Sequence, residues 1–431
     1  MVSRAQDKKE ALASRAILVG IAEDTRDLSA CESGLDELSR LLETAGGECA
    51  FRVIQVKEAP DSRTYIGKGK VREVSSLAEE HDVSLVVFDE ELSPSQIRNL
   101  EEELGSDERS VRVIDRTMLI LDIFALHAGS GEGKLQVELA QLRYTAPRLT
   151  GKGTALSRLG GGIGTRGPGE SQLERDRRHI SSRIHALETQ LSEMEKNRAT
   201  MRAARDRSGV PRVAIVGYTN AGKSTLLNTL TNAGVLAENK LFATLDPTTR
   251  RLTLPSGEEV LLTDTVGLIR KLPHHLIKAF RSTLDEAAQA DILLVLADAS
   301  DRECDEEIAV TFSLLDELGA SGKPTLLVYN KCDRAEASVR TEYREATEVV
   351  AISARTGEGL DELLAALARV VRAARRECTL LLPYSVQGKL NTLYEKGTVL
   401  SVDYEEGGVR VRAILDEKTA NAFAAYAGDD T

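Results

Sequence analysis

The sequence has no tryptophan, and aromatic residues make up only 4% of its 431 residues. Its five cysteines are scattered along the chain and form no C-x-x-C pair. This spacing argues against a disulfide framework and against a zinc site, and it is typical of a protein of the reducing cytoplasm. The cysteines are Cys31, Cys49, Cys304, Cys332 and Cys378.

Long apolar runs are also absent. None approaches the ~20 residues that a helix needs to cross a bilayer. The apolar patch near the start, AILVGIA, is followed by acidic residues and by no cleavage site typical of a signal peptide. We therefore expect a buried strand there, no membrane span and a cytoplasmic protein, either free or peripheral to a membrane.

A positive net charge is also absent, because 68 Asp and Glu outnumber 56 Lys and Arg and give a formal net charge of −12. That value argues against a nucleic-acid-binding surface over the whole molecule. The stretch 134–212 is different, because it holds 16 Lys and Arg against 8 Asp and Glu. A polyanionic partner is expected to meet this stretch, although a solvated helix rich in charges explains the count equally well.

The length predicts several domains. Up to residue 115, short apolar runs alternate with amphipathic stretches, which predicts a small parallel α/β domain over 1–116. A second such alternation predicts an α/β domain with a mixed, mostly parallel sheet over 211–373. A charged helix ending near Arg376 would then lead into a small α+β domain over 374–431.

Between the two α/β domains, helical spacing runs from Met118 to Tyr144 and again through a long uninterrupted pattern that follows Ser171. A basic, glycine-rich segment, 151–169, separates the two. We expect two long antiparallel helices, a hairpin arm over 117–210, with this segment at its tip.

The stretch RVAIVGYTNAGKSTLLNTL is typical of a strand, a glycine-rich loop and a helix, the context that a phosphate-binding P-loop requires. Backbone N–H groups and the helix N-terminus would face the phosphates. Lys223 is expected to bridge the β- and γ-phosphates, and the Ser224 hydroxyl to bind magnesium. The predicted loop comprises Gly217, Tyr218, Thr219, Asn220, Ala221, Gly222, Lys223, Ser224 and Thr225.

Three further motifs follow at the ends of predicted strands. Asp264 would bind magnesium through water, and the Gly267 amide would meet the γ-phosphate. The Asp333 carboxylate would accept the ring N–H and the exocyclic amine of guanine, which adenine does not offer. Four motifs in this order predict a GTPase that uses GTP and Mg²⁺. The added residues are Asp264, Thr265, Val266, Gly267, Asn330, Lys331, Cys332, Asp333, Ser353, Ala354 and Arg355.

The segment LFATLDPTTR should be a loop that holds the threonine of a nucleotide-dependent switch. Thr244, Thr248 and Thr249 all qualify, and spacing does not choose among them. After DTVG, where Ras-like enzymes have a glutamine that orients water, this chain has Leu268. We therefore assign no catalytic residue, keep Lys223 as a transition-state candidate, and expect slow intrinsic hydrolysis that a partner or the switch accelerates.

Asn220 has two interpretations. An asparagine at this place in a P-loop can help to bind a potassium ion, which would act as an arginine finger does. Equally, it can be a loop residue that bonds to its own backbone.

The segment GGGIGTRGPGES contains G-x-G-x-x-G, the pattern of a dinucleotide site. No strand precedes it and Pro168 interrupts it, which argues against a dinucleotide-dependent oxidoreductase. A flexible linker remains an alternative. The basic residues and the lack of acids before Glu170 favour a loop that contacts RNA. The RNA-contact candidates are Lys152, Arg158, Gly162, Gly164, Arg166 and Gly167.

Assembled, these motifs resemble the HflX family of bacterial ribosome-associated GTPases. The most specific stretches include VIDRTMLILDIFALHAGSGEGKLQVELAQLRYTAPRL, GGGIGTRGPGES, FATLDPTTR and DTVGLIRKLPHHLIKAFRSTL. The resemblance implies that Thr244 binds magnesium and acts as the switch residue. The apolar residue after DTVG, Leu268, also agrees with this resemblance. The implied switch segment is Phe242, Ala243, Thr244, Leu245 and Asp246.

The resemblance further implies that the N-terminal domain and the arm bind the large ribosomal subunit, with the glycine-rich tip at ribosomal RNA. The GTP-bound protein would split stalled ribosomes, and hydrolysis would release it. An assembly chaperone that uses GTP as a switch on large-subunit precursors would share every motif. We expect a monomer, and no DNA partner.

Overall fold

The structure is a computed structural model, and none of the helices among its described residues has the length and hydropathy of a membrane span. The described residues are 15–106, 109–151, 172–206, 210–231, 241–242, 244–273, 276, 286–335, 342–373 and 375–428.

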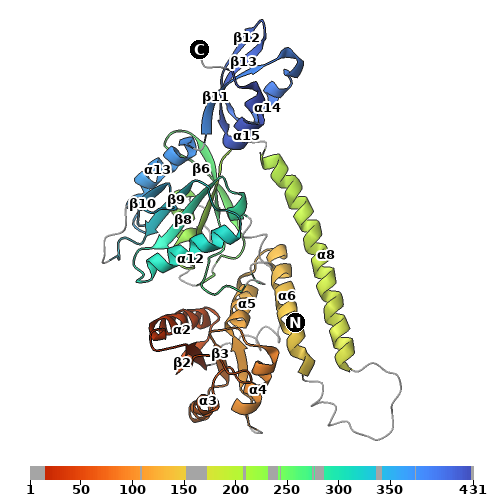
Figure 1. Ribbon diagram of the computed structural model, residues 1–431, viewed down its shortest axis with the longest axis vertical. Helices are drawn as coiled ribbons and strands as arrows, with labels where there is room; N and C mark the ends of the chain where they lie inside the picture. Colours follow the sequence, from red (N-terminus) through yellow and green to blue (C-terminus); the bar gives the residue numbers. More distant parts are fainter. Residues whose placement is uncertain are drawn as a thin grey trace. The chain divides into compact units, whose positions relative to one another are not determined.

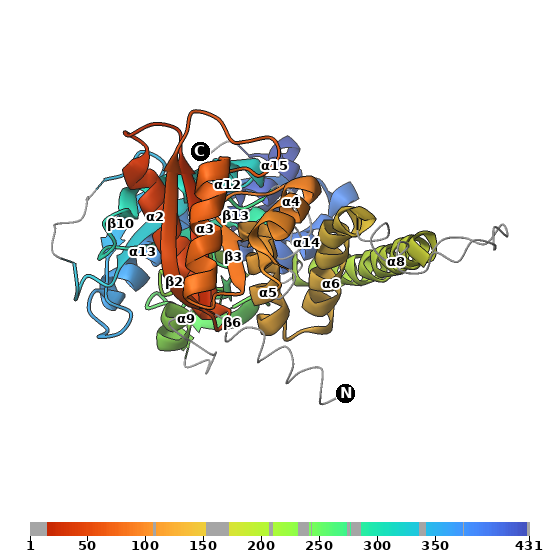
Figure 2. The same ribbon diagram turned by 90° about the horizontal axis from the view of Figure 1, so that it is seen from below.

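The N-terminal sheet has the strand order β2-β1-β3-β4, and all its strands run parallel. Each strand coincides with an apolar run of the sequence. Helices α3 and α4 pack on one face through a shared apolar core, and Figure 2 shows α3 alongside strands β2 and β3. The strands are β1 (Arg15–Ala22), β2 (Glu48–Val56), β3 (Leu85–Phe88) and β4 (Arg112–Asp115), and the helices are α2 (Leu28–Thr44), α3 (Lys68–Glu80) and α4 (Pro94–Leu104).

The helical segment before the glycine-rich tip is broken in two, where the sequence predicted one long helix. Helix α5 spans Arg116–His127 and α6 spans Gly131–Thr145, followed by the 3-10 helix η1 (Ala146–Gly151). The Ser130 hydroxyl caps α6 by accepting the Gly133 N–H at 2.8 Å. A serine cap next to glycine favours a new helix start over continuation.

The long helix expected after the tip is α8 (Gln172–Asp206). Its first half lies beside α6 (Figure 1), because Arg183 donates to Glu138 at 2.7 and 2.8 Å and Arg143 donates to Glu188 at 2.6 Å. The tip itself, and with it all six RNA-contact candidates, lies outside the described residues.

The second sheet has the order β10-β9-β8-β5-β7-β6, and only the pairing of β6 with β7 is antiparallel. The predicted mixed, mostly parallel sheet is confirmed. Helix α12 packs on one face and helices α9 and α13 on the other. The strands are β5 (Arg212–Gly217), β6 (Thr248–Thr253), β7 (Glu259–Asp264), β8 (Ile292–Asp298), β9 (Thr325–Asn330) and β10 (Glu348–Ala351); the helices are α9 (Lys223–Thr231), α12 (Cys304–Glu317) and α13 (Leu360–Ala373).

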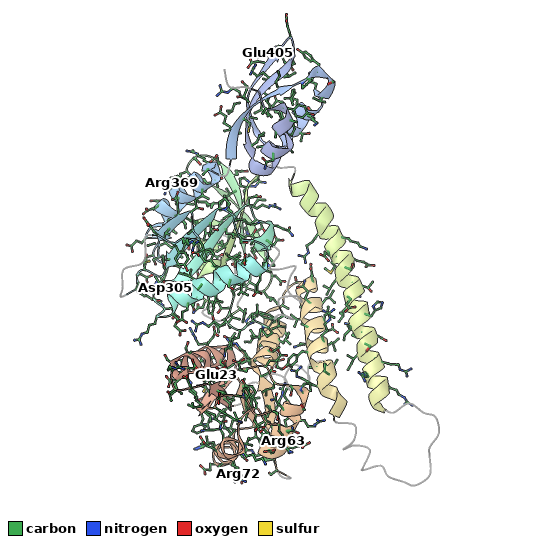
Figure 3. All side chains as sticks on the ribbon, viewed as in Figure 1. Glu23, Arg63, Arg72, Asp305, Arg369 and Glu405 are labelled. Carbon is green, nitrogen blue, oxygen red and sulfur yellow. The ribbon has the colours of Figure 1, made fainter. Side chains whose placement is uncertain are left out.

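Two expectations in this region were wrong. Part of the predicted switch loop is strand β6, whose sequence TTRRLT lacks the regular alternation of apolar and polar residues that indicates a strand. Helix α13 ends at Ala373 instead of near Arg376, and strand β11 begins at Arg375. Arg369 on α13, labelled in Figure 3, donates to Glu348 on β10 at 2.6 and 3.0 Å, which ties the helix to the edge of the sheet.

The last sheet is antiparallel, with the order β11-β13-β12. Side chains from α14 and α15 complete its core, including the fully buried Leu393. The elements are β11 (Arg375–Leu382), η2 (Tyr384–Val386), α14 (Lys389–Lys396), β12 (Thr398–Glu405), β13 (Gly408–Asp416), α15 (Glu417–Ala422) and η3 (Ala424–Tyr426). We propose the four predicted ranges as domains, with one sheet in each except the arm.

By contacts, the chain forms two compact units. One comprises 1–191 with 240–242 and 272–279, and the other comprises 192–239, 243–271 and 280–431. Two short segments of the second α/β region thus belong to the N-terminal unit.

Candidate nucleotide-binding site

The predicted P-loop connects β5 to α9, as its sequence context required. Gly217 has φ +150° and Gly222 has φ +99°, conformations that favour glycine. A Cβ atom at Gly217 would lie 2.1 Å from the Leu296 carbonyl oxygen, and one at Gly222 would lie 2.3 Å from Asn330 Nδ2. Both glycines are therefore required by close packing as well as by backbone conformation.

Lys223 is buried within this loop. Its Nζ donates to the carbonyl oxygens of Tyr218 at 2.7 Å and Gly217 at 3.1 Å. Burial lowers the pKa of Lys223 to about 8, against the opposing effect of the nearby Asp264 carboxylate. The Lys223 ammonium is thus held at the start of the loop. A negatively charged ligand bound there would favour its protonated form.

Three oxygen-bearing side chains converge at the start of α9. The Ser224 hydroxyl lies 2.7 Å from Thr244 Oγ1 and donates to Asp264 Oδ2 at 2.7 Å. Asp264 is fully buried, and burial raises its pKa. Its second oxygen, Oδ1, is buried without a hydrogen-bond partner among the described residues. Hydroxyl and carboxylate oxygens around an incompletely bonded anion suit a hard cation such as Mg²⁺.

The other two switch candidates lie elsewhere. Thr248 begins strand β6, and Thr249 shares a 2.9 Å hydrogen bond with Thr263 across β6 and β7. The structure therefore brings Thr244 to Ser224 and Asp264, a choice that spacing in the sequence left open.

A pocket of about 320 Å³ lies beside the P-loop, within the size range of small-ligand sites. It brings together most of the residues predicted to recognise guanine and three residues of the P-loop, Asn220, Gly222 and Thr225. Its walls come from Asn220, Gly222, Thr225, Asn330, Lys331, Asp333, Arg334, Ser353, Ala354 and Arg355.

Asp333 is held by several donors at the edge of this pocket. Ser353 Oγ donates to its Oδ1 at 2.7 Å, and Arg355 donates to its Oδ2 at 2.5 Å. The Ser353 hydrogen bond, with the charges of Arg355 and Arg334, holds the pKa of Asp333 below its ordinary value. The group is thus an ionised acceptor, as recognition of guanine N–H groups requires.

Asn330 joins the P-loop to the last strand end. Its Nδ2 donates to the Ala221 carbonyl at 2.8 Å, and its Oδ1 accepts the Ala354 N–H at 2.9 Å. Lys331, at φ +63°, donates to Asp298 at 2.6 Å. Asn330 and Lys331 therefore brace the pocket through neighbouring strands.

The segment after Asp264 is bonded to the P-loop. The Leu268 N–H donates to the Gly217 carbonyl at 3.1 Å, and the Thr219 N–H donates to the Leu268 carbonyl at 2.8 Å. The Tyr218 hydroxyl accepts the Arg270 N–H at 2.8 Å. The Leu268 side chain is buried. Because it is aliphatic, it supplies no polar group to the site.

The remaining predicted residues of the switch segment and of the later motifs differ in their surroundings. Phe242 is buried against Phe124 of α5 in the N-terminal unit, with ring centroids 4.8 Å apart, and does not line the pocket. Leu245 is buried and Asp246 half-buried, while Ala243 lies outside the described residues. Thr265 and Val266 are buried at the end of β7, and Cys332 is half-buried.

Two residues that contribute to the site were not predicted from the sequence. Arg334 lines the pocket, and Asp298 at the end of β8 holds Lys331. The position of Arg334, directly after the NKCD motif, was a weak indication that it contributes to the site. No such indication exists in the sequence for Asp298, because its contact with Lys331 depends on the pairing of β8 with β9.

Four family models match the chain. They are described as GTP-binding GTPase N-terminal (residues 32–125), GTP-binding GTPase Middle Region (127–205), 50S ribosome-binding GTPase (212–331) and HflX C-terminal domain (338–429).

Curated relatives match over most of their length. A protein named GTPase HflX from Lacrimispora saccharolytica is 50% identical, covering 95% of each chain. One with the same name from Escherichia coli K12 is 43% identical, covering 88% of each. A crystal structure of a GTP-binding protein from Sulfolobus solfataricus in complex with GDP is 26% identical, covering 83% of this chain and 98% of that chain, with a TM-score of 0.44.

Proposed function

The chain belongs to the HflX family of GTPases, and from this premise we propose that it binds the large ribosomal subunit and splits or rescues stalled ribosomes when GTP is bound. The observation that carries the proposal is the match of residues 212–331 to the 50S ribosome-binding GTPase model. The basic stretch 134–212 supports an RNA partner, because phosphate contacts dominate such binding.

For the nucleotide, we propose that guanine occupies the pocket beside Asp333 and that the phosphates follow the P-loop to Lys223. Ser224 and Thr244 would hold Mg²⁺, with Asp264 acting through water. The fit rests on the convergence of the two hydroxyls with Asp264, whose Oδ1 is buried without a partner in the described chain. Bound Mg²⁺ would neutralise charge on the β- and γ-phosphates.

A potassium ion at Asn220 remains part of the proposal. Asn220 has φ +62° and lines the guanine pocket, which is compatible with a ligand role and with a loop role alike. Equal GTPase rates in sodium and potassium buffers would remove potassium from the account.

We further propose that nucleotide state reaches the N-terminal unit through the switch segment. Thr244 lies in the proposed magnesium site, and two residues earlier Phe242 packs on Phe124. The Leu241 N–H donates to Thr44 Oγ1 of α2 at 3.2 Å. Ordering of Thr244 would thus be transmitted along the chain to Phe242 and Leu241, which make their contacts within the N-terminal unit.

The glycine-rich segment 151–169 is proposed as the RNA contact on sequence grounds alone, through Lys152, Arg158 and Arg166. We propose a cytoplasmic monomer. Action as an assembly chaperone on large-subunit precursors is the second candidate, and it uses the same nucleotide site.

Sedimentation of purified intact ribosomes with this protein separates the two candidates. We expect subunits to appear with GTP or a non-hydrolysable GTP analogue, and not with GDP. Ribosomes that stay intact in every nucleotide, with the protein only on free large subunits, would favour the chaperone.

A further inference from the structure

The hydroxyl of Thr219 is buried in the P-loop and has no hydrogen-bond partner among the residues that the structure describes. Thr219 is only 6% exposed. Buried hydroxyls nearly always have a partner, so an unbonded one within a nucleotide-binding loop requires an explanation. Its surroundings supply one.

Thr219 borders the place expected for the γ-phosphate. A Cβ atom at Gly267 would lie 2.7 Å from Thr219 Cγ2 and 3.2 Å from Lys223 Nζ. The Gly267 amide and the Lys223 ammonium are the two groups expected to meet the γ-phosphate. The Thr219 methyl carbon and the Lys223 ammonium therefore lie beside Gly267, and the Thr219 hydroxyl is bonded to the same Cβ atom as that methyl. The absence of a side chain at Gly267 leaves room for a ligand there.

The Thr219 side chain is also held in place. Its N–H donates to the Leu268 carbonyl at 2.8 Å, and the Leu268 N–H donates in turn to Gly217. A β-branched side chain on a fixed backbone has few rotamers. The side chain is thus confined to few positions beside Gly267 before any partner binds, which suits transition-state stabilisation.

Other hydroxyls near this position are already engaged. Ser224 bonds to Thr244 and Asp264. The Thr265 hydroxyl donates to the Ile215 carbonyl at 2.7 Å. Leu268, at the place where Ras-like enzymes have glutamine, has no polar group. Among these hydroxyls, that of Thr219 is the one without a hydrogen-bond partner in the described part of the chain.

We propose that Thr219 is a catalytic residue for GTP hydrolysis, and that its hydroxyl donates a hydrogen bond to a γ-phosphoryl oxygen in the transition state. The water oxygen attacks the γ-phosphorus while the bond to the β–γ bridging oxygen breaks. That bond's electrons leave with GDP, and the water's protons leave with inorganic phosphate and solvent. The proposal rests on the placement of GTP given above and does not depend on ribosome splitting.

Two substitutions separate the hydroxyl from the methyl group. Thr219→Val keeps the branched shape and removes the hydroxyl, whereas Thr219→Ser keeps the hydroxyl and removes the methyl. We expect Thr219→Val to lower kcat about 10- to 100-fold, near the lower bound for losing one transition-state donor. The Kd for GDP should stay within about twofold. Thr219→Ser should keep most of the activity, and Thr253→Val, at an exposed position on β6, should match the unmodified protein.

Binding of GDP with aluminium fluoride, which mimics the γ-phosphoryl group in transit, gives a second readout. Thr219→Val should weaken that complex while leaving GDP binding intact. A Thr219→Val enzyme with normal kcat would overturn the proposal, and so would a Thr219→Ser enzyme as slow as the valine variant. Unchanged GDP and GTP binding in Lys223→Ala would instead contradict the placement of the nucleotide.

Discussion

Lys223 shows at the scale of a single residue how the fold prepares the site for a polyphosphate. Burial lowers the pKa of Lys223 from 10.5 to about 8, so near pH 8 part of the population is neutral. Phosphates favour the charged ammonium and should raise this pKa in the complex. Binding should therefore take up protons as the pH rises through about 8, and affinity should fall over the same range.

Isothermal titration calorimetry with GDP in two buffers of different ionisation enthalpy measures this uptake. We expect uptake to grow between pH 7 and pH 8.5, approaching about half a proton per site near pH 8. Below pH 7 the amine is charged in both states and contributes no pH dependence. Uptake that stays constant across this range would show that the Lys223 pKa is not lowered.

Elements differ in how far the sequence determines them. The P-loop context was readable because glycines, lysine and serine occur at fixed spacing between a strand and a helix. The break between α5 and α6 was missed, since the apolar spacing continues across Ser130, whose cap is a local hydrogen bond. The choice of Thr244 over Thr248 and Thr249 depended on tertiary contacts and on β6, which no periodic pattern marks.

The switch segment carries a prediction at the scale of elements. Phe242→Ala removes the ring that packs on Phe124, at a cost of about 3–5 kcal/mol in stability for a buried phenylalanine. Because Phe242 does not line the guanine pocket, the Kd for GDP should stay within about twofold. Splitting of ribosomes at saturating GTP should fall at least about tenfold if Phe242 transmits the nucleotide state.

Phe312→Ala is the matched control, since Phe312 stacks on Tyr343 with centroids 5.5 Å apart and lies far along the chain from Thr244. It should also lower the free energy of unfolding but leave splitting intact. Equal losses of splitting in both variants would attribute the effect to stability alone.

The whole molecule combines a GTPase region with an N-terminal unit that includes residues 240–242 and 272–279. Neither composition nor spacing predicted that two short segments flanking Thr244 and Asp264 would belong to the other unit. The family models match ranges in both units, from residue 32 to residue 429. We propose that the nucleotide bound at Asp333 controls the state of the ribosome.

Asp333→Asn tests that claim directly, because an amide should favour xanthine over guanine. Sedimentation of intact ribosomes would compare this variant with the unmodified protein, each with non-hydrolysable analogues of GTP and of xanthosine triphosphate. We predict that the variant yields subunits with the xanthosine analogue and not with the GTP analogue, and that the unmodified protein does the reverse. Splitting by the variant with the GTP analogue, or with no nucleotide, would contradict the account.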